Sequence, residues 1–203
     1  KSSADFSIIG VWAVSSNGDW MLVDGQCKRQ EMPTNVDDLF HYAQKYKPMS
    51  VGVEISGQQG GFIQWIENEM IRRNIFFTLA KKLGTNTVGI RPTADKLQRF
   101  VTGVAARFKQ GKVWLPKFSS LETTNIKLQE LADELEAELG KLTLAGGVKA
   151  LKHDDALDLL NQLSEIEIYL PSAEPIPMIE NEETSVWHND YVSENEDTSY
   201  DVE

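Results

Sequence analysis

Two groups of acidic residues stand out because of where they lie in the sequence. Glu54 ends the apolar segment SVGVEI and is followed by the glycine-rich stretch SGQQGG, and the segment KHDDALDLL carries Asp154, Asp155 and Asp158. On a helix, residues three or four apart share a face, so these aspartates would repel one another unless a cation lay between them. Carboxylates from a strand end and a helix can hold two Mg²⁺ or Mn²⁺ ions about 3.5–4 Å apart around a scissile phosphate. The residues therefore indicate metal-dependent phosphodiester hydrolysis.

Each group also has a structural explanation. Glu54 could be the first solvated residue after a strand, and acids in the first turn of a helix are favoured by the helix dipole. His153 could be a metal ligand or an outer-sphere base, but a surface histidine at a helix start is more common. The residues taken alone leave these alternatives open.

Several other classes of protein are excluded or disfavoured. The glycine-rich stretch lacks the Gly-Lys-Ser/Thr ending of an ATP-binding loop, and the chain has no G-x-S-x-G motif of a serine hydrolase. The single cysteine, Cys27, cannot form an internal disulfide and has no zinc-type neighbours. No apolar run approaches the roughly 20 residues needed to span a bilayer, and the N-terminal segment is unlike a signal peptide. We expect a cytoplasmic protein without a membrane partner.

The net charge of −11 is unevenly distributed along the chain. Residues 171–203 carry ten acidic and no basic residues, and we predict that they form an acidic disordered tail. Residues 1–170, the predicted folded domain, are close to neutral. Within them, residues 71–117 contain eleven Lys or Arg and one acid, which is typical of a phosphate-binding surface. The candidate DNA-binding residues are Lys96, Arg99, Arg107, Lys109 and Lys112.

The apolar patterns alternate between strand and helix periods and predict an α/β fold. Strands are expected at 6–14 and 20–24, joined by an Asn-Gly hairpin turn, and at 50–55, 75–80 and 112–116. Helices are expected at 35–47, capped by Thr34, at 62–73, from Thr93 to 110, at 122–139 and at 153–162. A strand, a glycine loop, a helix and a strand in succession at 50–80 favour a right-handed parallel crossover.

Three blocks in this order resemble the C-terminal nuclease domain of tailed-phage large terminase subunits. They are VGVEISGQQGG, the pattern K-x-x-R-F…F-x-x-G-K-V-W-L-P from Lys96 to Pro116, and H-D-D-x-x-D from His153 to Asp158. The resemblance covers residues 5 to about 163. It implies a ribonuclease H-like mixed sheet flanked by helices, two catalytic divalent ions, and cleavage of concatemeric double-stranded viral DNA during genome packaging.

The resemblance also implies roles for individual acids. Glu54 is similar to the second catalytic carboxylate of the family and Asp155 to the third, with Asp154 or Asp158 assisting. The family's principal aspartate lies several residues upstream of a second acid, and Asp5 in A-D-F-S resembles that second acid. We therefore expect the principal aspartate to precede Lys1, or Asp5 to replace it as a catalytic residue and metal ligand.

Partners and alternative functions follow from the same comparison. Double-stranded DNA, the terminase ATPase domain, the small terminase subunit and the portal are the partners that the family implies, in the cytoplasm of the host cell. A junction resolvase or another ribonuclease H-like nuclease would share the carboxylates. A protein of a different class, a non-catalytic packaging module that docks on the portal or motor, would keep the fold without a metal site.

Overall fold

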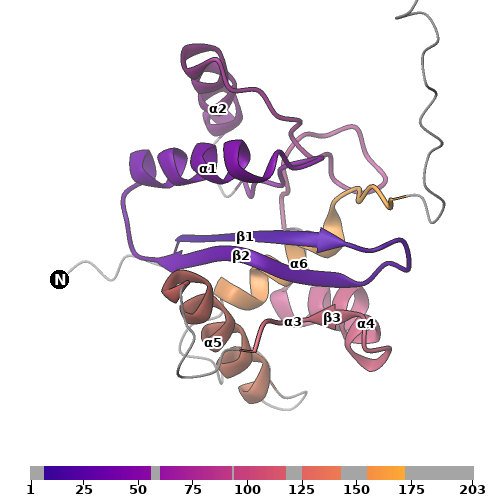
Figure 1. Cartoon of the computed structure of the whole chain (residues 1–203). Coiled ribbons are helices and arrows are strands. Elements are labelled where there is room, and N and C mark those ends of the chain that lie inside the picture. The colour runs from indigo at the N-terminus through magenta and orange to yellow at the C-terminus, as the bar shows by residue number, and fades with distance from the viewer. Residues whose placement is uncertain (1–6, 56–59, 93, 118–124, 143–154, 172–203) are drawn as a thin grey trace, which may run out of the picture. The chain divides into compact units, whose positions relative to one another are not determined.

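The computed structural model describes residues 7–55, 60–92, 94–117, 125–142 and 155–171 (Figure 1). The chain divides after Pro171 into two units, and the second, 172–203, lies outside the described residues. The predicted acidic tail therefore falls almost entirely outside them. No helix in the described ranges is both long and apolar enough to cross a membrane.

The predicted hairpin is confirmed at the centre of the first unit. Strands β1 (Ser7–Val14) and β2 (Trp20–Lys28) pair antiparallel, and β2 continues beyond its predicted end at Asp24. Gly18 in the turn has φ +77°, a left-handed conformation that glycine adopts without steric cost. Strand β3 (Val113–Trp114) pairs parallel with β2, which gives a three-stranded mixed sheet in the order β1-β2-β3.

A bulge in β2 changes which side chains face each side of the hairpin. Val11 pairs with Asp24 and Trp12 with Leu22, so Val23 is the extra residue. Side chains alternate along a strand, and one inserted residue reverses the alternation. Leu22 consequently packs with the core formed by helices α5 (Ile126–Lys141) and α6 (Asp155–Glu165), whereas Asp24 hydrogen-bonds to residues near the end of helix α1 (Met32–Tyr46).

The first apolar core lies between the sheet, α5 (Ile126–Lys141) and α6 (Asp155–Glu165). The predicted seam of α5 is confirmed, since Leu128, Leu131 and Leu135 are buried and Leu139 packs at the margin. Asn125 caps α5 by accepting a hydrogen bond from the backbone N–H of Leu128. The helix thus starts a few residues later than the predicted residue 122, and residues 118–124 lie outside the described ranges.

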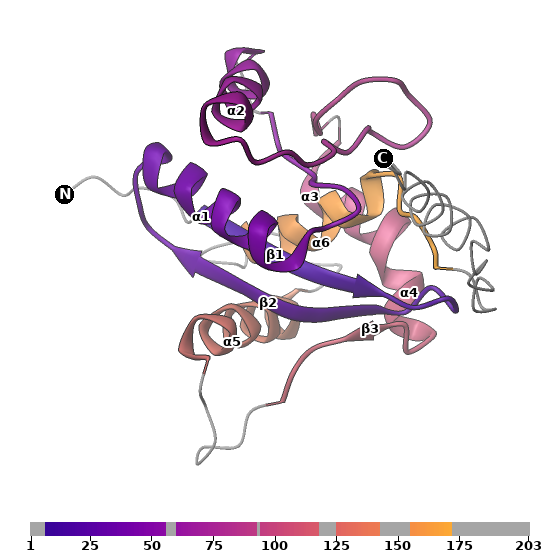
Figure 2. The same ribbon diagram turned by 45° about the horizontal axis from the view of Figure 1, so that its top comes forward.

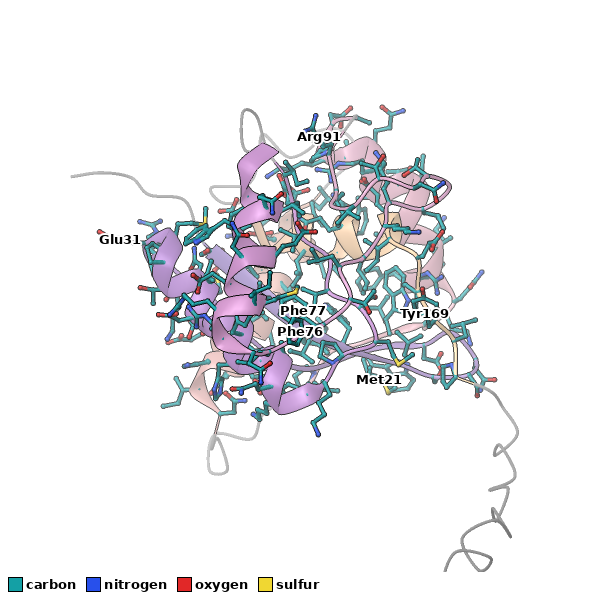
Figure 3. All side chains as sticks on the ribbon, turned by 90° about the horizontal axis from the view of Figure 1, so that it is seen from above. Met21, Glu31, Phe76, Phe77, Arg91 and Tyr169 are labelled. Atoms are coloured by element: carbon teal, nitrogen blue, oxygen red, sulfur yellow. The ribbon has the colours of Figure 1, made fainter. Side chains whose placement is uncertain are left out.

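The other side of the hairpin is covered by α1 (Met32–Tyr46) (Figures 1 and 2). The prediction that Thr34 caps this helix is wrong, because the helix begins after Glu31 with proline in its first turn, a position where the missing N–H of proline costs nothing. A second apolar core joins α1 to α2 (Gly60–Arg73) and the segment that follows it. Within this core lies Phe77, which is labelled in Figure 3. Its ring meets that of Phe40 edge to face, with the ring centroids 5.3 Å apart.

The predicted strands 50–55 and 75–80 form single parallel bridges instead of continuous ladders. Val51 pairs with Leu79, and Glu54 pairs with Ile90. The backbone N–H of Ile55 donates to Ile90 O, and the N–H of Ile90 donates to Val53 O, each at 2.8 Å. These bonds fix the backbone on both sides of Glu54.

The helix predicted from Thr93 to residue 110 is divided into three parts. Helix α3 (Lys96–Arg99) is followed by a π-helical turn, η1 (Phe100–Val104), and by α4 (Ala105–Lys109). Asp95 caps α3 by accepting from the N–H of Gln98 at 3.0 Å, and the predicted cap, Thr93, lies outside the described residues. The π turn interrupts the regular helix that was predicted to carry the candidate DNA-binding residues Lys96, Arg99 and Arg107.

Candidate active site

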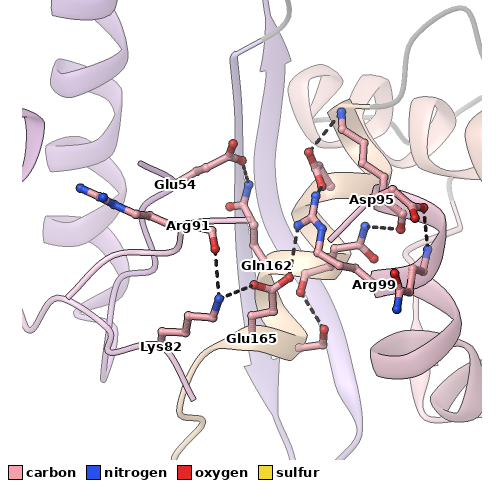
Figure 4. A network of polar contacts seen from close by, with 12 residues as sticks. Glu54, Lys82, Arg91, Asp95, Arg99, Gln162 and Glu165 are labelled. Atoms are coloured by element: carbon pink, nitrogen blue, oxygen red, sulfur yellow. Dashed lines mark hydrogen bonds and ion pairs between the residues drawn. The ribbon is translucent and has the colours of Figure 1, made fainter. Parts of the chain in front are cut away.

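Glu54 lies at the end of the bridged segment and faces the last helix. Its carboxylate accepts a hydrogen bond from the side-chain amide of Gln162 on α6 (Figure 4). Burial raises the pKa of Glu54, and the negative charge of Asp158 raises it further, while Arg99 and Lys96 oppose the shift. The strand-end carboxylate is therefore joined to α6 one turn after Asp158.

Asp158 is buried on α6 and is held by two cations. The Arg99 guanidinium donates from Nη2 to Asp158 Oδ1, and Lys96 Nζ lies 3.1 Å from Asp158 Oδ2. Asn161, fully buried one turn further along, donates from Nδ2 to the backbone oxygen of Lys96 at 3.1 Å. α3 and α6 are thus joined by charge pairing and by a backbone contact at the same place.

The pairing continues to Glu165 at the end of α6. Arg99 Nη1 lies 3.2 Å from Glu165 Oε1, and Lys82 Nζ lies 3.8 Å from Glu165 Oε2. Lys82 also donates to the backbone oxygen of Arg91 at 3.0 Å (Figure 4). We call the set Glu54, Lys82, Lys96, Arg99, Asp158, Gln162 and Glu165 the Glu54–Asp158 network. Its three carboxylates face three basic side chains.

Asp155 lies among a different set of groups. Its charge contributes to raising the pKa of Glu138 to about 7 and that of Cys27 to about 12, and burial is the main cause of both shifts. Glu138 on α5 accepts from the backbone N–H groups of Ala156 at 3.3 Å and Leu157 at 2.6 Å. Asp158 is the helix acid whose charge acts on Glu54. Three further candidates lie outside the described residues: Asp5, His153 and Asp154.

The predicted DNA-binding residues have different environments. Arg99 is only 7% exposed and its guanidinium contacts carboxylates instead of solvent. Lys96 pairs with Asp158, and Lys112 lies 3.2 Å from Asp19. Arg107 lies over the Trp20 ring at 4.2 Å and donates to Gly18 O at 2.9 Å. Within the described ranges Arg107 and the exposed Lys109 make no ion pair, so these two can offer charge to a phosphate.

The sequence prediction missed most of the polar residues of the network. The helix was expected to end at Gln162, but α6 continues to Glu165. Asp158, Asn161, Gln162 and Glu165 are spaced by three, four and seven residues, which places them on one helical face. That polar stripe, opposite the apolar face, was the available signal. No such sequence pattern predicts that Lys82 belongs to the network. Lys82 lies near Glu165 because its backbone pairs with that of Ile166.

The donor types in the network suit a hard cation, since Mg²⁺ and Mn²⁺ bind carboxylate and amide oxygens. Glu54 and Asp158 offer two carboxylates at one place. No group of three or more His, Cys, Asp or Glu side chains in the described part of the chain is arranged to hold a metal ion. A full ligand set would need acids from outside those ranges. In comparisons with known proteins, no family model, no curated protein and no solved structure matched this chain.

Proposed function

We propose that this chain is a divalent-metal-dependent DNA endonuclease of the large-terminase type, with a ribonuclease H-like fold. The observation that carries the proposal is the hydrogen bond that joins Glu54, at the end of a parallel-bridged segment, to Gln162 on the last helix, one turn after Asp158. Two acids separated by about a hundred residues of sequence thus belong to one polar network, and carboxylate oxygens are the ligands that Mg²⁺ and Mn²⁺ prefer. The resemblance of three sequence blocks to terminase nucleases supports the same function.

In this proposal Glu54 and Asp158 hold the cation, together with the acids predicted at Asp5 and Asp154. When bound, the ions supply Lewis-acid activation of water and charge stabilisation at the leaving oxygen. Gln162 orients the Glu54 carboxylate through their hydrogen bond. Arg107 and Lys109 provide positive charge for the DNA backbone, because neither is neutralised by an acid in the described residues.

The first test compares metal binding and plasmid cleavage in Glu54→Gln and Asp158→Asn. Each change removes one ligand charge and keeps the side-chain shape, so we expect calorimetric Mn²⁺ binding and nicking of supercoiled plasmid both to fall by more than about tenfold. Glu67→Gln is the matched control, since Glu67 is exposed on α2. Mn²⁺ binding and cleavage that survive unchanged in both site variants would refute the proposal.

The same assay decides which acid of α6 acts as the ligand. The terminase resemblance assigns that role to Asp155, whereas the charge coupling to Glu54 favours Asp158. If Asp158 is the ligand, Asp158→Asn abolishes Mn²⁺ binding and Asp155→Asn retains most of it. The reverse result would support the family assignment, with α6 oriented differently when metal is bound.

A second candidate function is a non-catalytic packaging module, and one observation favours it. The Glu54–Asp158 network is already balanced, with Lys96 and Arg99 on Asp158 and Lys82 beside Glu165. A charge-balanced network can hold α3 and α6 together without a metal ion. If the chain has this function, the wild-type chain should not bind Mn²⁺ at millimolar concentration. Adding the ion should then leave the midpoint of thermal unfolding unchanged.

A further inference from the structure

The segment that follows α6 forms one wall of a pocket. This segment, residues 166–170, is held at its start by a backbone bridge between Ile166 and Lys82. Ile166, Ile168 and Leu170 lie at alternate positions and all line the pocket. The segment thus presents a row of apolar side chains to the pocket.

The other walls come from η1, α4 and β2, through Gly103, Arg107 and Trp20. The guanidinium carbon of Arg107 lies 4.2 Å from the centroid of the Trp20 ring, and Arg107 Nη1 donates to Gly18 O at 2.9 Å. Among the described residues that line the pocket, Arg107 is the only charged one. The pocket therefore combines an apolar wall with a single positive charge.

The size of the pocket limits what it can hold. Its volume is about 240 Å³, and two of its lining side chains, Leu83 and Leu170, are 59% and 58% exposed. Sites for cofactors and other drug-sized ligands occupy roughly 300–1,000 Å³, whereas an apolar cavity of about 150 Å³ is enough to bind benzene. The pocket therefore fits one large side chain and is too small for a cofactor.

An apolar side chain fits the lining better than a nucleotide base does. Proteins hold unpaired bases largely by stacking them on aromatic rings. Trp20 is the only aromatic residue among the described residues of the lining, and its ring is 1% exposed and lies under Arg107. The hydroxyl of Ser164, also in the lining, already donates to Asn161 O at 2.7 Å.

We propose that this pocket docks a partner protein that inserts one large apolar side chain next to an aspartate or glutamate. The apolar side chain packs on Ile168 and Leu170, as an anchor residue fills a pocket at the centre of an interface. The acid pairs with Arg107, which makes no ion pair in the described ranges, and arginine binds carboxylates strongly. Docking requires no metal ion. Because Arg107 is also proposed to face the DNA backbone, the partner and DNA should compete for it.

The experiment selects peptides from a displayed library of random sequences on the wild-type chain. We expect the enriched peptides to share a large apolar residue adjacent to Asp or Glu. Measured by fluorescence anisotropy, their affinity should fall about tenfold in Arg107→Gln and in Leu170→Ser, which remove the charge and part of the apolar wall. Ile126→Ser is the matched control and should bind as the wild type does, since Ile126 is 65% exposed on α5 and does not line the pocket.

A second measurement keeps the wild-type chain and changes the peptide, so it does not depend on the folding of a variant. Replacing the acid of the peptide by its amide should also weaken binding about tenfold. The proposal is overturned if no peptide is enriched, or if the amide peptide binds as tightly as the acid.

Two other occupants would give different results, and either result would overturn the proposal. If a second copy of the chain fills the pocket, sedimentation should show a wild-type dimer that Leu170→Ser dissociates. If a base fills it, Leu170→Ser should weaken binding of single-stranded DNA, whereas the proposal expects this affinity to be unchanged.

Discussion

At the scale of single residues, Glu138 is a carboxylate in an apolar setting. It is 3% exposed on the buried seam of α5, and it accepts the backbone N–H groups of Ala156 and Leu157. The first N–H groups of a helix have no partner within the helix, so Glu138 satisfies two of them for α6 from a neighbouring helix. Burial raises its pKa to about 7, and the two backbone bonds only partly oppose this.

The raised pKa of Glu138 makes stability depend on pH in a definite direction. Its ordinary pKa is 4.5, so the folded chain binds a proton more tightly than the unfolded chain between pH 4.5 and about 7. The resulting stability is complete below pH 4.5 and is lost as the pH rises through 7. Between roughly pH 5 and pH 8 we expect Glu138 to lower the free energy of unfolding of the wild type by about 2–3 kcal/mol. Glu138→Gln should lack this decrease when the two free energies are measured by urea unfolding.

Glu136→Gln provides the control for this change. Glu136 lies on the same helix and is exposed, so its replacement should leave the pH dependence as in the wild type. If Glu138→Gln and the wild type show the same loss of stability between the two pH values, Glu138 is not the titrating group.

At the scale of elements, the contact between the π turn and α6 depends on the absence of a side chain. A Cβ at Gly103 would lie 2.4 Å from Ser164 Oγ and 3.0 Å from Ser164 Cβ. We expect Gly103→Ala to lower the free energy of unfolding by about 1–3 kcal/mol, because η1 and α6 must move apart. Ser164→Gly in the same chain should recover part of this loss in denaturant unfolding.

Gly140 is the matched control for that substitution. It lies in α5 and a Cβ there would meet nothing within 4 Å. Gly140→Ala should therefore stabilise the chain by about 0.5–1 kcal/mol through helix propensity alone. Equal effects at the two glycines would show that the close approach of η1 to α6 does not limit stability.

The sequence could predict elements with a strong local signal and missed those decided by tertiary contacts. The Asn-Gly turn and its apolar flanks predict the hairpin, and the leucine repeat of α5 predicts its buried seam. The prediction that Arg99 binds DNA assumes that its side chain is exposed on a regular α-helix. The π turn that follows Arg99 and the acids of α6 that surround it become visible only after folding.

The candidate site could be predicted in part for the same reason. Glu54 was found because an acid is unusual at the end of an apolar strand, and Asp158 because it belongs to an acidic cluster. Which acid of that cluster meets Glu54 depends on the rotation of α6 about its axis. The N-terminal anchor at Glu138 and the contact with Arg99 fix that rotation, and both partners are distant in sequence.

At the scale of the whole molecule, the near-neutral body uses many of its cations internally. Arg72 and Arg73 pair with Glu69, Lys82 with Glu165, and Lys112 with Asp19. The basic residues of 71–117 that make no ion pair in the described ranges are Lys81, Arg91, Arg107, Lys109 and Lys117. Any DNA-binding surface therefore has fewer available charges than the sequence total suggests, and its salt dependence should be correspondingly shallow.

The bulge at Val23 has a consequence for the order in which the molecule unfolds. It turns Asp24 toward the end of α1, where burial would raise its pKa but hydrogen bonds from Lys45, Tyr46 and Asn125 lower it to about 2. The stability from Asp24 is present above its ordinary pKa of 3.8 and is lost as the pH falls toward 2. Glu138, on the opposite side of the hairpin, favours the folded state most strongly in acid.

Acid should therefore loosen one side of the hairpin before the other. We expect backbone amides of α1 to lose protection from hydrogen exchange as the pH falls from 3.8 toward 2, while those of the C-terminal half of α5, around Glu138, and of the start of α6 keep theirs. Hydrogen exchange followed by mass spectrometry after acid incubation would resolve the two helices. Simultaneous loss of protection in both would mean that the hairpin transmits unfolding across itself. Loss in α1 first would mean that a one-residue insertion divides the molecule into an acid-labile half and an acid-resistant half.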